Sequence, residues 1–136
     1  MSVTEGYSGK PLAAKLGVSR GFRVLLDGTP DGFELGELAA DVVVHSRVGK
    51  GRYDVGVLFC PDLGRLTTRW PVLHDKVTPA GRLWVAWPKR ASGIMTDVDE
   101  NLVRAHGLAH GRVDTKVCAI DATWSGLAFV VRLKDR

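Results

Sequence analysis

The residues with the clearest chemical potential follow a short apolar run at 82–87. Trp87, Pro88 and Lys89 place an aromatic plane beside a cation, a pair that can hold a planar anionic ligand by stacking and charge. Asp97 lies shortly after, in the first turn of a predicted helix whose backbone N–H groups favour anions. The alternative is structural: Trp87 fills the core and Lys89 pairs with Asp97. The sequence leaves both interpretations open.

Two further polar residues lie where a strand is predicted to end. Asp27 and Thr29 fall in a dense cluster of turn formers after a strand at 22–26. Ligands of open α/β sheets gather beyond the carboxyl ends of the strands, so both residues are candidates for ligand binding.

The C-terminal third supplies the remaining candidates. Asp114 and Lys116 are two apart in a predicted strand at 112–120, which places them on one face as an acid/base pair or as a surface ion pair. Trp124 and Ser125 sit in a predicted hairpin turn, where Trp124 either closes a pocket, anchors a partner or packs in the core.

Several known motifs are absent. Residues 6–10 (GYSGK) resemble a phosphate loop but lack its spacing and a preceding strand, so we expect an ordered N-terminal arm there. No GxGxxG, GxSxG or CxxC pattern occurs, and Cys60 and Cys118 are expected to be apolar residues without a bridge. His106 and His110 are spaced to chelate a metal on a helix, but Gly107 lies between them without a partnering glutamate. We therefore predict no cofactor and no metal.

The elements that position these residues indicate an α/β protein. Residues 54–60 and 82–87 are apolar at both odd and even positions, which indicates central strands covered on both faces. A helical stripe over 63–77 separates them, and a hairpin of 112–120 with 126–133 ends the chain. These patterns predict a compact Rossmann-like three-layer sandwich, mostly parallel with a C-terminal antiparallel hairpin. One domain spans 1–136, with an arm and short helix at 1–20 and the α/β core at 21–136.

Some finer predictions depend on single residues. A short helix is expected at 33–39, weakened by Gly36, and a turn at 78–81. Pro71 should kink or split the helix that contains it. Thr96 has the position of a helix N-cap, with Asp99 three residues later.

The positive charge is local. The 136 residues carry a formal charge of +4, and residues 47–90 hold nine basic and three acidic side chains. This stretch is either a solvated surface or a patch for phosphate, a carboxylate ligand or nucleic acid. Aromatic residues do not alternate with basic ones, so nucleic-acid binding is not expected. The lack of an apolar signal core or membrane-length apolar run predicts a cytoplasmic protein with no membrane contact.

Two resemblances extend this interpretation. The strand DVGVLFC, the following helix and TPAGRLWVAWP are similar to the later strands of class I methyltransferase-like Rossmann domains, over roughly residues 54–133. The whole chain resembles domain-of-unknown-function family 3052, a group of small bacterial proteins. The resemblance is carried by GYSGKPLAAKLG, LWVAWPK and VDTKVCAIDATWSGL, by the spacing TD–E–VR at 96–104 and by the ending at 132–136. The second resemblance implies no activity. It marks positions to inspect: Gly6, Tyr7, Ser8, Gly9, Lys15, Trp84, Trp87, Lys89, Asp97, Arg104, Asp114, Lys116, Trp124 and Ser125.

Three functions remain open. The leading prediction is a Rossmann-like module that binds a small anionic ligand or a protein without catalysis. The second is a partner protein, for example a homodimer whose tryptophans form an exposed patch. The third is an enzyme of unknown reaction, for example a degenerate methyltransferase-like domain, with Lys89, Asp97, Asp114 and Lys116 in one cleft.

Overall fold

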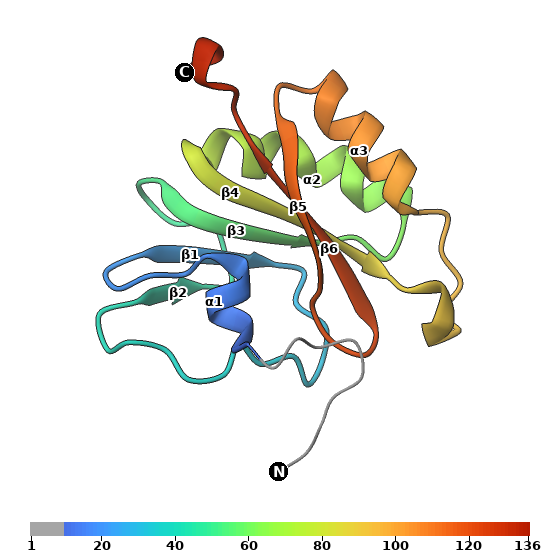
Figure 1. Cartoon of the computed structure of the whole chain (residues 1–136), viewed down its shortest axis with the longest axis horizontal. Helices are drawn as coiled ribbons and strands as arrows, with labels where there is room; N and C mark the ends of the chain where they lie inside the picture. Colours follow the sequence, from blue (N-terminus) through green and yellow to red (C-terminus); the bar gives the residue numbers. More distant parts are fainter. Residues whose placement is uncertain (1–9) are drawn as a thin grey trace.

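A single six-stranded sheet organises the chain in the strand order β2-β1-β3-β4-β6-β5 (Figure 1). The structure is a computed structural model and describes residues 10–136. Neighbouring strands from β2 to β4 pair in parallel, and β6 is antiparallel to both β4 and β5. The predicted α/β class is confirmed, and the sheet is mixed. The strands are β1 (Arg23–Asp27), β2 (Val43–His45), β3 (Tyr53–Phe59), β4 (Val77–Pro88), β5 (Val113–Ala119) and β6 (Trp124–Val130).

The two faces of the sheet are covered unequally. Two longer helices lie on one face, and one short helix lies on the other (Figure 1). The opposite face is otherwise covered by irregular segments, so this third layer is mostly loop. The helices are α1 (Leu12–Leu16), α2 (Leu63–Lys76) and α3 (Glu100–Ala109), with short 3₁₀ turns η1 (Arg90–Ser92) and η2 (Leu133–Asp135).

The central strands behave as their composition predicts. Residues 55 and 57–59 of β3 and 83–87 of β4 are almost entirely buried, and their side chains alternate between the cores of the two faces. Burial of apolar area on both sides is worth about 25 cal/mol per Å², which makes this pair the anchor of the sheet.

Helix α2 is continuous through Pro71, so the predicted split into two helices does not occur. The helix starts at Asp62, whose side chain accepts a hydrogen bond from the Arg65 N–H at 2.8 Å. Leu66, Trp70 and Leu73 are each at most 1% exposed, on both sides of the proline. Packing of this stripe on the sheet outweighs the cost of about 3 kcal/mol that a proline imposes inside a helix.

Three local predictions are corrected. Residues 33–39 form no helix, because Phe33 and Leu35 pack onto the sheet at a spacing of two and Gly36 has a φ of 86°. Residues 78–81 extend β4 instead of turning. The cap of α3 is Asp99, which accepts from the Leu102 N–H at 2.8 Å; the Thr96 hydroxyl donates to the Pro61 carbonyl instead.

A register shift in β5 separates two residues expected on one face. Asp114 pairs with Phe129 and Lys116 with Ala128, which are consecutive residues of β6. Consecutive strand residues point to opposite faces, so Asp114 faces α3 and Lys116 faces the α1 side. The predicted acid/base pair therefore does not form.

The tryptophans and cysteines are mostly interior. All four tryptophans are 7% exposed or less, so they build no exposed patch for a second copy. Cys60 is buried and Cys118 half-buried, and both are free thiols. Burial raises the pKa of Cys60 to about 12, despite the opposing charge of Arg65. Within residues 10–136, every helix is too short or too polar to cross a bilayer.

Candidate functional site

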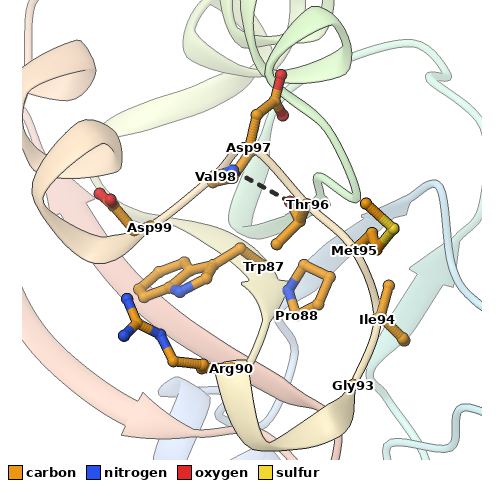
Figure 2. Close-up of a pocket in the computed structure, with 10 residues that line it drawn as sticks. All are labelled: Trp87, Pro88, Arg90, Gly93, Ile94, Met95, Thr96, Asp97, Val98 and Asp99. Carbon is orange, nitrogen blue, oxygen red and sulfur yellow. Dashed lines mark hydrogen bonds between the residues drawn. The ribbon is translucent and has the colours of Figure 1, made fainter.

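A hollow lies at the carboxyl end of β4 (Figure 2). It has a volume of about 660 Å³. Trp87, Pro88, Arg90 and residues 93–99 line it, and together they form what we call the Trp87 pocket. Trp87 is 6% exposed and forms its floor, whereas Met95 is 94% exposed on its rim.

Hydrogen bonds to backbone groups fix the pocket's loop. The Asp97 Oδ1 accepts from the Leu63 N–H at 2.8 Å, and Thr96 reaches Pro61, so the loop is attached to the start of α2. In Figure 2 the Asp97 carboxylate is directed away from the indole of Trp87. Asp97 therefore acts as a cap on α2, with its negative charge at the positive end of the helix dipole.

Trp87 and Lys89 do not share this pocket. Lys89 is absent from its lining, and its backbone N–H donates to the Thr123 carbonyl at 2.7 Å. The positive charges of Lys15, Lys116 and Lys89 all act on Cys118, whose pKa is raised because burial outweighs them. The aromatic plane and the cation thus form no stacking pair in this pocket, and Trp87 packs in the core, as the structural interpretation predicts.

The other predicted residues are dispersed. Asp114 accepts from Arg104 Nε at 3.0 Å beside α3. Trp124 packs edge-on against Phe59 in the α1-side core, while Ser125 pairs in register with Trp87. Thr29 is exposed in the loop after β1. The predicted shared cleft of Lys89, Asp97, Asp114 and Lys116 is therefore not formed. The candidates Gly6 to Gly9 lie outside the described residues.

A second hollow, of about 440 Å³, opens at the carboxyl ends of β1 and β2. Asp27, Gly28, residues 46–48, Arg65, Arg69 and Val72 line it, and we call it the arginine crevice. After β1 the chain adds β2 on one side of β1, and it then crosses over to add β3 on the other side. The carboxyl end of β1 is therefore the topological switch point of the parallel strands. Open α/β sheets bind ligands in that position.

Charge holds the crevice in shape. Arg65 Nη2 donates to Asp27 Oδ1, and Arg69 donates to Oδ2 through Nη2 at 2.6 Å and Nε at 3.1 Å. Arg65 Nε also donates to the Phe59 carbonyl at 2.9 Å, at the end of β3. Asp27 is 6% exposed, so two guanidinium groups neutralise a buried carboxylate.

Sequence reasoning found Asp27 but missed its partners. Arg65 and Arg69 are one helical turn apart on α2, and this spacing was the available signal. Their contacts to Asp27 span 38 and 42 residues, which no local pattern reveals.

Histidines gather elsewhere, between α2 and α3. The rings of His106 and His110 stack with centroids 4.1 Å apart, and His110 Nδ1 donates to the His106 carbonyl at 2.7 Å. Among residues 10–136, no group of three or more His, Cys, Asp or Glu side chains could hold a metal ion.

Comparison with solved structures gives methyltransferase-like neighbours. A ribosomal protein L11 methylase from Lactobacillus delbrueckii subsp. bulgaricus aligns with a TM-score of 0.54 at 13% identity, covering 89% of this chain and 75% of its own. A "putative methyltransferase" from Thermoplasma acidophilum aligns with a TM-score of 0.50 at 10% identity, covering 88% and 73%. These similarities establish the fold. No protein-family model and no curated protein matches the chain.

The leading functional prediction is corrected by these neighbours. We expected a binding module without catalysis, and both similar structures are described as methyltransferases. The third hypothesis, an enzyme of unknown reaction such as a degenerate methyltransferase-like domain, agrees better with these neighbours.

The residues of the switch point do not fit the methyl donor that such a fold implies. S-adenosylmethionine carries a sulfonium cation, and the crevice presents three arginines against one carboxylate. The Arg65 guanidinium also covers Gly28, where an added Cβ would lie 2.5 Å from Nη2. Arg47 follows β2 where a ribose-binding fold of this kind places an acidic side chain. The crevice is therefore assigned no step of methyl transfer.

Proposed function

We propose that this chain is a methyltransferase-like enzyme whose substrate binds in the Trp87 pocket. The similarity of its fold to two methyltransferase structures supports this proposal most directly. The proposal treats the molecule as a small Rossmann-like three-layer framework. The resemblance to family 3052 stays a prediction and adds no activity.

The lining of the pocket favours a particular substrate class. Trp87 offers an apolar floor, and Ile94 and Met95 extend the apolar surface along the rim. Arg90 is exposed and makes no side-chain hydrogen bond or ion pair with the described residues. These features suit a substrate with a flat apolar body and an acidic group, the body on Trp87 and the acid on Arg90.

The other predicted ligand residues have no part in this proposal. Asp97 positions the loop through α2, and Thr29, Asp114, Lys116, Trp124 and Ser125 stay predictions for other contacts. A protein partner or a homodimer likewise stays a prediction.

Untargeted turnover tests the proposal. The purified chain is incubated with a small-molecule cell extract, and mass spectrometry follows the compounds consumed. We expect wild type to consume at least one compound, and Arg90→Ala to lower its rate about 10-fold or more, since a charge-assisted hydrogen bond is lost. Arg90→Lys should retain part of the rate.

The control is Arg20→Ala, an equally simple loss of a surface guanidinium at a side chain that is 87% exposed and outside both hollows. It should match wild type. Absence of any consumed compound, or equal rates for Arg90→Ala and Arg20→Ala, would contradict the proposal.

A further inference from the structure

We propose that the arginine crevice binds the phosphate group of a second, phosphorylated substrate. This inference rests on the proposed function, because it assigns the crevice to the same enzyme. Its first support is position: the crevice lies at the switch point of the sheet, and β1, the nearer of its two strands, is two strands from β4, which is about 10 Å.

The second support is charge. Arg47, Arg65 and Arg69 face a single carboxylate, Asp27, so the crevice keeps a positive balance. Arg65 and Arg69 are one-third exposed at their side chains, whereas Asp27 is almost wholly covered. The carboxylate is therefore shielded by the guanidinium groups, which present their outer surface to an incoming ligand.

The third support is preorganisation. Asp27 and the Phe59 carbonyl accept hydrogen bonds from Nε and Nη2 of the two arginines. These bonds hold both guanidinium groups in place without using either Nη1. Guanidinium N–H groups match phosphate oxygens in geometry and charge. A phosphate would meet donors already fixed in place, at a lower cost in side-chain entropy.

Arg47 supplies a cation without a structural task. It is exposed, follows β2, and makes no hydrogen bond or ion pair with residues 10–136. The exposed Ser46 adds a hydroxyl beside it. The crevice volume of about 440 Å³ lies within the range of small-molecule sites.

Titration calorimetry with inorganic pyrophosphate tests the inference. Wild type should bind, and Arg47→Glu should weaken binding about 10-fold or more, because an attractive charge becomes repulsive. Arg47→Lys should lose only a few-fold. Arg20→Glu, the same charge reversal outside the crevice, should bind as wild type does. Equal binding by the two Glu variants, or no binding by wild type, overturns the inference.

Two further probes identify the source of the phosphate. ADP should compete with pyrophosphate, while a mixed-sequence 10-nucleotide RNA and S-adenosylmethionine should not. If the RNA binds more tightly than ADP and loses affinity in Arg47→Glu, the site is a nucleic-acid surface and the inference is wrong. Competition by S-adenosylmethionine would also refute it, and would restore the methyl donor.

Binding is measured here without turnover, so the two proposals can fail separately. A crevice that fails to bind pyrophosphate in a chain that consumes a substrate refutes only this inference. Pyrophosphate binding without any turnover would keep the crevice as a phosphate site, but it would remove the proposed function and with it the role of the phosphorylated ligand as a substrate.

Discussion

The arginine crevice and the loop of the Trp87 pocket are both attached to α2, but they are held in different ways. The crevice depends on ion pairs from α2 to Asp27, a carboxylate that is almost wholly buried. The pocket depends on Thr96 and Asp97, whose side chains bond to backbone groups at the start of α2, and on an aromatic floor.

In the Trp87 pocket, the residues that stabilise the fold differ from the arginine proposed to bind the substrate. In the arginine crevice, the same arginines do both. In the Trp87 pocket, Arg90 takes no part in the frame, so its replacement should leave the fold intact. In the arginine crevice, Arg65 and Arg69 both neutralise Asp27 and face the ligand. Charge there sets shape and affinity together.

The largest effect should come from Trp87→Ala, because Trp87 belongs to the core as well as to the pocket. Removing a buried tryptophan side chain lowers the free energy of unfolding by about 3–5 kcal/mol. Urea unfolding measures this loss, and Trp87→Phe should lose clearly less because the ring fills part of the space. A loss under about 1 kcal/mol for Trp87→Ala would place Trp87 outside the core.

A somewhat smaller effect is expected for Asp27→Asn. Breaking a buried ion pair costs about 3–5 kcal/mol, and the partial exposure of both arginines reduces this to about 2–3 kcal/mol. Pyrophosphate should restore part of the stability, because it supplies negative charge to the two arginines that have lost their carboxylate partner.

The matched control for this charge removal is Asp135→Asn. Asp135 pairs with Arg132 at the surface, so its loss should cost less than about 1 kcal/mol. Equal unfolding energies for the Asp27 and Asp135 variants would show that the crevice is not built on its carboxylate.

The smallest effect is that of pH, which should act outside both regions. Burial, followed by the charge of Arg112, lowers the pKa of His74, and burial, followed by the charge of His110, lowers the pKa of His106. Below the unfolded-state pKa of about 6.5 the unfolded chain binds more protons than the folded chain, so stability falls as pH falls.

Urea unfolding at pH values of about 7.5 and about 6.0, on either side of the ordinary histidine pKa, measures this change. His74→Gln should reduce it, because glutamine can still accept the Arg112 hydrogen bond, now 3.0 Å long at His74 Nδ1, without titrating. A pH dependence unchanged by this substitution would exclude His74 as its source.

The sequence predicted the elements whose signals are local. The apolar runs of β3 and β4 and the stripe on α2 needed no knowledge of distant contacts. The segment 33–39 was missed because Phe33 and Leu35 satisfy the sheet face without a helix, and Asp99 took the capping role expected of Thr96.

The candidate site was less accessible from sequence. The sequence locates Trp87 at the end of a strand. It does not show on which side of the sheet the chain continues after Pro88, and this determines where the Lys89 side chain lies. The sequence does not single out Arg65 and Arg69, because their shared partner, Asp27, lies far away in the chain, in β1. The register shift at Asp114 moves Lys116 to the other face of the sheet. No residue pattern in 112–120 predicts this shift.

That register shift also determines how the sheet ends. A bulge twists β5 away from the flat, regular geometry that another strand needs for pairing, and Lys116 adds a charge to the same edge. At the far edge, β2 is only three residues long. Both margins of the sheet thus oppose strand-to-strand growth, which protects a chain whose central strands are strongly apolar from aggregating through its own edges.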